Sequence, residues 1–209
     1  MRRILGASVV FAILAMGMAG GVANAAGETE GTEVAPLVSS TVVVNEVSTR
    51  GLNGQLDEFI ELHNMSSQPL DISGYQVRIY SPAGVVTDTI VVPAGTVLQS
   101  KGNSGQYVVL VGQNFSGTIA DQTNVIPFTL TTAEGIPTAG GVTVQNLAGT
   151  KLDGVAFSNA VTQAREGQAA VPESATTDQL NASNTRNILS TDTDNNRVDF
   201  SLQLRSAGQ

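Results

Sequence analysis

The chain contains no cysteine and no tryptophan, and its only histidine is His63. The absence of cysteine rules out disulfides, a lipid-modified cysteine and thiolate metal sites, so burial of an apolar core must stabilise any folded domain. Zinc sites and Ser-His catalytic pairs need more partners than one histidine provides. We therefore expect His63 to be a surface or half-buried residue without a catalytic role. The absence of tryptophan also disfavours sugar binding by aromatic stacking.

Basic residues are scarce as well. The sequence has 10 Lys and Arg residues against 18 Asp and Glu residues, which gives a formal net charge of −8. After Arg2 and Arg3 the basic residues occur singly, so no basic stripe is available to neutralise phosphates. An acidic surface repels nucleic acid and anionic lipid, and we expect no nucleic acid partner. A phosphate-binding loop is also absent, because Gly140 and Gly141 lack a following Lys-Ser/Thr pair and helix.

The first 25 residues have the layout of a secretory signal peptide. Arg2 and Arg3 form a positive start, residues 4–18 are apolar, and residues 23–25 form a small-x-small cleavage sequence. We expect export by the Sec route, a secreted, extracellular or cell-envelope location, and no membrane span after signal cleavage. An uncleaved anchor is the alternative, because the apolar stretch approaches the roughly 20 residues that cross a bilayer.

The rest of the chain is predicted to be a tether followed by one all-β domain. Residues 26–40 form a flexible acidic tether, because they have too few apolar residues to order themselves. From residue 41, short β-branched runs alternate with turn residues, which predicts an antiparallel sandwich over residues 41–205. Residues 158–190 are a long loop or insertion with one short helical turn near 176–181. The expected strands are residues 41–47, 58–64, 75–81, 85–92, 106–112, 125–130, 142–146, 152–157 and 198–204.

Residues 41–75 resemble the opening of the lamin tail domain (LTD), the immunoglobulin-like module of nuclear lamins and of many secreted bacterial proteins. The matching residues fall in two strands and at the start of a third: Asn45, Glu46, Glu58, Ile60, Glu61, Leu62, Asn64, Leu70, Asp71, Ile72, Ser73, Gly74 and Tyr75. Near the end of the chain, an arginine, an Asp/Asn-rich turn and an Asp-Phe pair also resemble bacterial members: Arg186, residues 191–196, Asp199 and Phe200. The resemblance implies an immunoglobulin-like antiparallel β-sandwich and a bacterial interaction domain.

Four carboxylates lie near the start of the domain, namely Glu46, Asp57, Glu58 and Glu61. If the first two strands pair, Glu46 approaches Glu61, and a glycosidase acid/base pair needs two carboxylates about 5–10 Å apart. The competing interpretation is structural, because the glutamates alternate with apolar neighbours, as edge or rim residues do. We favour the structural interpretation and expect no catalytic residues.

A second acidic group follows the spacing Asp192-x-Asp194-x-Asn196-x-x-Asp199. Alternate oxygen ligands at this spacing resemble the first half of a calcium loop. An EF-hand also needs Gly at its sixth and Glu at its twelfth position, and counting from Asp192 those positions hold Arg197 and Gln203. We favour a hairpin or Asx turn over a calcium site.

The sequence therefore predicts an exported, non-enzymatic binding or structural module of the cell envelope or extracellular space. It is expected to act through loops or a sheet edge on an unidentified envelope or extracellular protein or surface, without a cofactor. Two alternatives stay open: a small secreted hydrolase that uses Glu46 and Glu61 or the Asp192–Asp199 loop with a metal, and a calcium-stabilised adhesin.

Overall fold

A computed structural model describes residue 39 and residues 41–209 of the chain. The expected signal peptide, residues 1–25, and all of the expected tether except Ser39 lie outside the described residues. In the part that is described, no helix is both long enough and apolar enough to cross a membrane.

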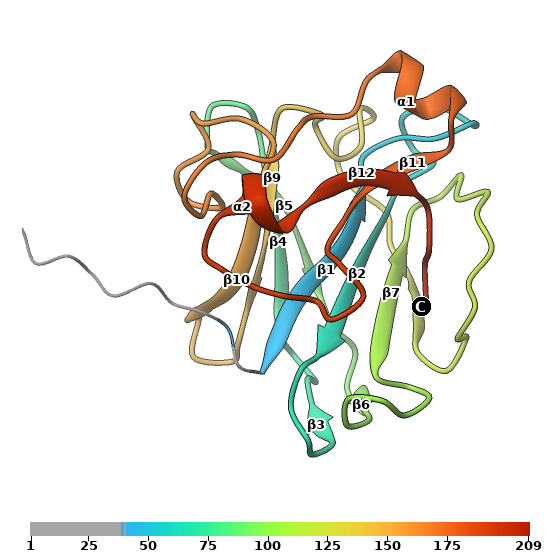
Figure 1. The fold of residues 1–209 in the computed structure, drawn as a ribbon, viewed down its shortest axis with the longest axis vertical. Coiled ribbons are helices and arrows are strands. Elements are labelled where there is room, and N and C mark those ends of the chain that lie inside the picture. Colours follow the sequence, from blue (N-terminus) through green and yellow to red (C-terminus); the bar gives the residue numbers. More distant parts are fainter. Residues whose placement is uncertain (1–38, 40) are drawn as a thin grey trace, which may run out of the picture. The chain divides into compact units, whose positions relative to one another are not determined.

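The described residues form two β-sheets that enclose a common core, with few helices (Figure 1). The larger sheet has six strands in the order β12-β11-β1-β2-β7-β8, and the smaller has four in the order β10-β9-β4-β5. A third, two-stranded sheet pairs β3 with β6. These strands are β1 (Val42–Ser48), β2 (Phe59–Asn64), β3 (Leu70–Asp71), β4 (Gln76–Tyr80), β5 (Val86–Val91), β6 (Val97–Leu98), β7 (Tyr107–Val111), β8 (Val125–Pro127), β9 (Gly141–Gln145), β10 (Lys151–Ala156), β11 (Ala182–Thr185) and β12 (Ser201–Leu204). The expectation of an all-β sandwich is confirmed.

Three features differ from the sequence prediction. The strands are not all antiparallel, because β8 pairs with β7 in parallel. The segment 158–190, expected to be a loop with one helical turn near 176–181, contains helix α1 (Ala175–Gln179) at that turn and, unexpectedly, the strand β11. The last strand begins at Ser201 and not at Val198, because helix α2 (Asn196–Asp199) occupies its expected start.

The core lies between the two large sheets and is built from alternate strand residues. Side chains of a strand point to opposite faces in turn, so every second apolar residue faces the same layer. Both sheets contribute β-branched and leucine side chains that are fully buried: Val42, Val44, Ile60, Leu62, Val108 and Leu110 from the larger, and Val77, Ile79, Val142, Val144 and Val155 from the smaller. This burial stabilises the sandwich without disulfides.

A β-bulge in β1 interrupts this alternation at one position. The register between β1 and β2 shifts between Val44 and Glu46, so that Glu46 lies opposite Glu61. Val44 and Val47 remain in the core on either side of the bulge. Because a bulge adds one residue to the alternation, Asn45 and Glu46 both face away from the core, onto the outer face of the six-stranded sheet.

Truncating a core residue tests this packing. Leu62→Ala should lower the free energy of unfolding by about 2–5 kcal/mol, because it leaves a cavity between the sheets. Leu147 is 76% exposed, and Leu147→Ala should change stability by less than about 0.5 kcal/mol. Urea denaturation of both variants measures the difference. Equal losses would contradict the core assignment.

Candidate functional site: buried carboxylates and a polar pocket

The C-terminal strap, residues 205–209, hydrogen-bonds two glutamates on the outer face of the six-stranded sheet. Ser206 donates to Glu46 from its backbone N at 2.9 Å and from its Oγ at 2.7 Å. The backbone N of Gly208 donates to Glu61 at 2.5 Å. Both glutamates are fully buried, so the expectation that they lie at an edge or rim was wrong. They are covered because β1 and β2 are central strands of the sheet and the strap hydrogen-bonds a glutamate of each.

The surroundings of Glu46 and Glu61 favour the protonated, uncharged form of both side chains, and they do not form a substrate cleft. Burial, together with the charge of Glu46, raises the pKa of Glu61 to about 8. Burial also raises the pKa of Glu46. Ser183 donates to Glu46 at 2.6 Å and Asn45 to Glu61 at 2.7 Å, in addition to the strap. A glycosidase pair faces a substrate between its two carboxylates, whereas these carboxylates face the strap.

His63 is buried, which contradicts the expectation of a surface or half-buried residue. Its Nδ1 lies 2.7 Å from Ser190 Oγ, and its Nε2 lies 2.9 Å from Gln106 Oε1. The ring of Tyr107 packs on the imidazole with centroids 4.3 Å apart. Burial lowers the pKa of His63. Its partners come from distant loops, so no local sequence pattern reveals them.

Arg186 is the centre of a third buried cluster, and it joins the two large sheets. Its guanidinium pairs with Asp153 of β10 at 3.0 Å, with Asp199 at 3.0 Å and with Asp192 at 3.5 Å. It also donates to two backbone carbonyl groups and lies 4.5 Å from the ring centroid of Phe200. Three of the residues that carry the second lamin-tail resemblance, Arg186, Asp199 and Phe200, are thus in contact.

Of the residues with calcium-like spacing, Asp192 and Asp199 both pair with Nη1 of Arg186, and the others make separate turn contacts. Asp194 donates from its backbone N to Asp192 at 3.2 Å, as in an Asx turn. Asp199 accepts from the Thr193 hydroxyl at 2.6 Å and pairs with Arg186, as above. The side chain of Asn196 hydrogen-bonds three backbone groups of other segments. These contacts are the ones that the turn interpretation predicts.

A different acidic set offers metal-ligand geometry. One oxygen each of Asp153, Glu166 and Asp192 lies within 4.8 Å of the others. Arg186 already pairs with Asp153 and Asp192, and Lys151 pairs with Glu166 at 2.8 Å. Two cationic side chains therefore already pair with these three carboxylates.

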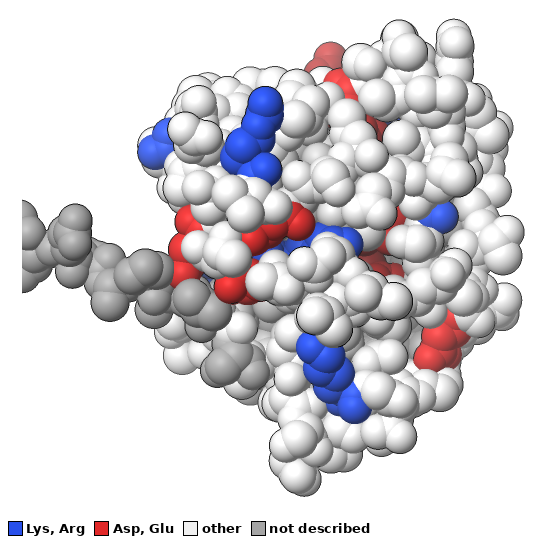
Figure 2. All heavy atoms as spheres, viewed as in Figure 1, with Lys and Arg blue, Asp and Glu red and all other residues white. Residues whose placement is uncertain are grey.

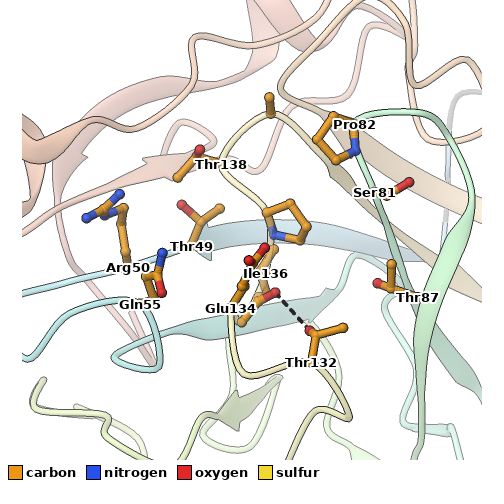
Figure 3. A pocket seen from close by; sticks show the side chains of 13 residues that line it. Thr49, Arg50, Gln55, Ser81, Pro82, Thr87, Thr132, Glu134, Ile136 and Thr138 are labelled. Carbon is orange, nitrogen blue, oxygen red and sulfur yellow. Dashed lines mark hydrogen bonds between the residues drawn. The ribbon is translucent and has the colours of Figure 1, made fainter.

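Three loops form a polar pocket of about 310 Å³ (Figure 3). Figure 3 shows Arg50, Gln55 and Glu134 on one side of the pocket, opposite Pro82 and Thr87. The lining provides hydroxyl, amide, carboxylate and guanidinium groups and no aromatic ring: Thr49, Arg50, Gln55, Ser81, Pro82, Thr87, Thr132, Glu134, Gly135, Ile136, Pro137, Thr138 and Ala139. Such a pocket is suited to a polar ligand that both accepts and donates hydrogen bonds.

Two buried glutamates hold the walls of this pocket from behind. Glu58 accepts from the backbone N of Ile136 at 2.6 Å, and Glu173 accepts from the backbone N of Thr49 at 3.0 Å. Burial raises the pKa of Glu58 to about 7 and the pKa of Glu173 to about 8. Sequence reasoning missed Glu173, because it lies in a segment without strand or helix periodicity. It also missed the partner of Glu58.

The remaining residues of the first lamin-tail resemblance shape turns. Asn64 donates two hydrogen bonds to loop carbonyl groups. Asp71 accepts from the backbone N of Ser73 at 2.9 Å, and Gly74 has a φ of 75°, a conformation that favours glycine. Tyr75 packs against the core. None of these residues lines the polar pocket.

The fold and these clusters define an all-β sandwich with buried carboxylates and a polar pocket of about 310 Å³. No protein-family model matches the chain, and no curated protein matches it either. The resemblance to lamin tail domains therefore stays a prediction.

Stability should be highest near pH 5 and fall toward pH 8. The ordinary pKa of these glutamates is 4.5, whereas the pKa of Glu58 in the fold is about 7 and those of Glu61 and Glu173 are about 8. Between these values the folded state binds more protons than the unfolded state, so the free energy of unfolding declines as the pH rises. Melting temperatures from pH 5 to pH 9 measure this decline.

Glu173→Gln should make the decline of stability with rising pH shallower, because it removes one of the groups that stay protonated in the folded state. Glu134→Gln, at an exposed position, should leave the slope unchanged. A melting temperature that is flat or rises between pH 5 and pH 8 would contradict the assignment.

Removing the guanidinium of Arg186 should lower the free energy of unfolding. Arg186→Met leaves buried carboxylates without a counterion and should lower the free energy of unfolding by about 3–5 kcal/mol. Arg186→Lys keeps the charge but loses the fork that binds Asp153, so an intermediate loss is expected. Arg197 is exposed, and Arg197→Met should be neutral in urea denaturation. A neutral Arg186→Met would show that the cluster does not join the sheets.

Proposed function

We propose that this chain is an exported binding or structural module of the cell envelope or extracellular space, and that its polar pocket receives a polar segment of a partner. The observation that supports the proposal most strongly is that buried side chains fix the walls of the pocket in place. Glu58 and Glu173 hydrogen-bond its walls from inside the fold. A pocket fixed before binding loses less conformational entropy when a ligand enters, which raises affinity.

The chemical groups that line the pocket limit the kinds of partner that it can bind. Arg50 and Glu134 provide one positive and one negative group, and the hydroxyl groups of the threonines add donors and acceptors. Arg50 is itself paired with Asp178, so its charge is partly neutralised. These features favour a protein segment or surface group that carries polar atoms of both kinds over a ligand with a large single charge.

The charge distribution disfavours nucleic acid as the partner. On the face shown in Figure 2, Lys and Arg side chains are isolated from one another, while Asp and Glu side chains form a patch left of centre and also appear near the top and at the lower right. The formal charge of the whole chain is −8. A phosphate backbone would be repelled by such a surface.

Membership of the lamin tail domain family is part of the proposal. The contact of Arg186 with Asp199 and Phe200 supports it, since the resemblance rests on those residues in that order. So does the β-sandwich architecture. The immunoglobulin-like topology and the interaction role follow from the family, and export follows from residues 1–25 alone.

The two alternative functions have weaker support. A hydrolase based on Glu46 and Glu61 needs substrate between carboxylates that the strap now covers. A calcium-stabilised adhesin needs a cation at an acidic cluster where Arg186 and Lys151 already pair. Sensitivity of the melting temperature to a chelator would distinguish the adhesin.

A capture experiment tests the binding proposal. The exported chain is immobilised and exposed to solubilised envelope proteins and to cell-wall glycans from its source, with calcium and with a chelator. We expect a saturable partner that is retained by wild type in both conditions. Thr138→Trp, which fills the pocket, should reduce the affinity for that partner by at least about tenfold, or 1.4 kcal/mol.

Thr150→Trp is the matched control, because Thr150 is exposed and does not line this pocket. It should bind as wild type does. Equal loss in both variants, equal binding by both, or no saturable partner in either condition would contradict a binding role of the pocket.

A further inference from the structure

Ser190 combines three features that a structural serine does not need. Its Oγ lies 2.7 Å from Nδ1 of His63. Its φ is 52°, in the left-handed region that non-glycine residues seldom adopt and that often marks functional sites. It lines a second pocket of about 210 Å³, together with Asn45, Tyr107 and Ser206. The proximity of nucleophile, base and cavity meets the geometric requirement for an activated nucleophile.

The tautomer of His63 is fixed by Gln106. The Oε1 of Gln106 accepts from the backbone N of Gly102 at 2.7 Å, so this atom is the oxygen of the amide. The same oxygen lies 2.9 Å from His63 Nε2, which must therefore carry a hydrogen. In the neutral imidazole, Nδ1 is then the free acceptor that faces Ser190. Gln106 thus has the orienting role of the third member of a catalytic triad.

The hydroxyl hydrogen of Ser190 can be donated to His63 or to Asn45, and the protonation state of Glu61 determines which of the two accepts it. Ser190 Oγ lies 2.6 Å from Asn45 Oδ1, and Asn45 Nδ2 lies 2.7 Å from Glu61 Oε1. If Glu61 is ionised, it accepts from Nδ2 of Asn45 and holds the amide in this orientation. Ser190 then donates to Oδ1 of Asn45. In that case His63 must be protonated at Nδ1 so that it can donate to Ser190 Oγ. If Glu61 is protonated, it donates to a reversed Asn45 amide, and Ser190 donates to neutral His63.

The surroundings favour the neutral arrangement. Burial and the charge of Glu46 raise the pKa of Glu61 to about 8, and burial and the charge of Lys101 lower the pKa of His63. Tyr107, packed on His63, is also neutral near pH 7, since its pKa is raised to about 12. Near neutral pH, the hydrogen of Ser190 is thus directed at Nδ1 of His63.

We propose that Ser190 is a nucleophile that accepts an acyl group from short-chain esters in this second pocket, with His63 as its general base. Ser190 Oγ attacks the ester carbonyl carbon and its proton passes to His63 Nδ1. The ester C–O bond breaks, and the leaving alkoxide takes that proton. Water then attacks the acyl-serine in the same way, releasing the acid and restoring Ser190. Tyr107 lines the pocket and offers a hydroxyl donor to the developing oxyanion.

Covalent labelling tests this proposal. Diisopropyl fluorophosphate is small, and its reaction forms an Oγ–P bond while fluoride leaves with the serine proton. We expect one adduct per chain, located at Ser190 by peptide mass spectrometry. Ser190→Ala should reduce the labelling rate by at least about 100-fold. Ser201→Ala is the matched control, because Ser201 is an exposed serine of β12 that does not line this pocket, and it should be labelled at the wild-type rate.

The pH dependence of 4-nitrophenyl acetate hydrolysis tests the positioning role of Glu61. The wild-type rate should rise as His63 loses its proton and fall again near pH 8, where Glu61 ionises. Glu61→Gln can still accept from Gly208 and donate to Asn45, so it should abolish the alkaline fall and leave the acid limb in place. Circular dichroism at each pH verifies that the variants are folded.

Labelling at Ser206, equal labelling of Ser190→Ala, or no adduct on the folded wild-type chain would each overturn the proposal. The last result would mean that Glu61, Asn45, Ser190 and His63 form a structural hydrogen-bond chain only. The proposal is independent of ligand binding at the larger polar pocket, so failure of either leaves the other intact.

Discussion

The ion pair between Arg186 and Asp153 is the interaction on which the arrangement of the two sheets depends. Asp153 belongs to β10 of the smaller sheet, and Arg186 follows β11 of the larger. Both side chains are fully buried, and the backbone of Val44 in β1 bonds to each of them, donating to Asp153 and accepting from Arg186. Charges without access to water must be paired and hydrogen-bonded, so the segment that carries Asp192 and Asp199 has to fold back onto this guanidinium.

The same requirement explains how the long irregular segments become ordered. Four of the buried glutamates, Glu46, Glu58, Glu61 and Glu173, accept a hydrogen bond from the backbone of a loop or strap that is distant in the sequence. Ile136, Thr49 and Gly208 provide these donors to three different glutamates. A loop amide that would otherwise be unsatisfied gains an acceptor, and the carboxylate gains a donor. The loops are thus positioned by the interior of the sandwich, and this gives the polar pocket a defined shape.

Burying the carboxylates also costs free energy when they are ionised. The stability of the fold therefore depends on their protonation. Burial without a full positive partner favours the neutral acid, as the raised pKa of Glu61 shows. A protein with such a core is most stable in mildly acidic surroundings. At Asp153, burial likewise raises the pKa, but the charge of Arg186 opposes that rise by direct pairing. The molecule therefore stabilises buried acids in two ways, by protonation in one place and by a guanidinium in another.

Alternation of apolar residues was sufficient to predict the all-β sandwich and most of its strands, because core strands must place every second side chain inward. It did not reveal β11, whose sequence Ala-Ser-Asn-Thr is polar and small yet buried on both faces. Nor did it reveal the bulge at Asn45, which adds one residue to the period. The surroundings of His63 depend on Ser190 and Gln106, which lie 127 and 43 residues away, and such contacts leave no local pattern.

The most direct test of the account is amide hydrogen exchange, measured by nuclear magnetic resonance, at the backbone donors to the buried glutamates. Thr49, Ile136 and Gly208 lie outside the strands, yet their amides should be as strongly protected as those of the central strands β1 and β2. Protection near that of the sheet would support interior carboxylates as the anchors of the loops. Exchange at the rate of an exposed loop would contradict this account, because the glutamates would then have no fixed partner.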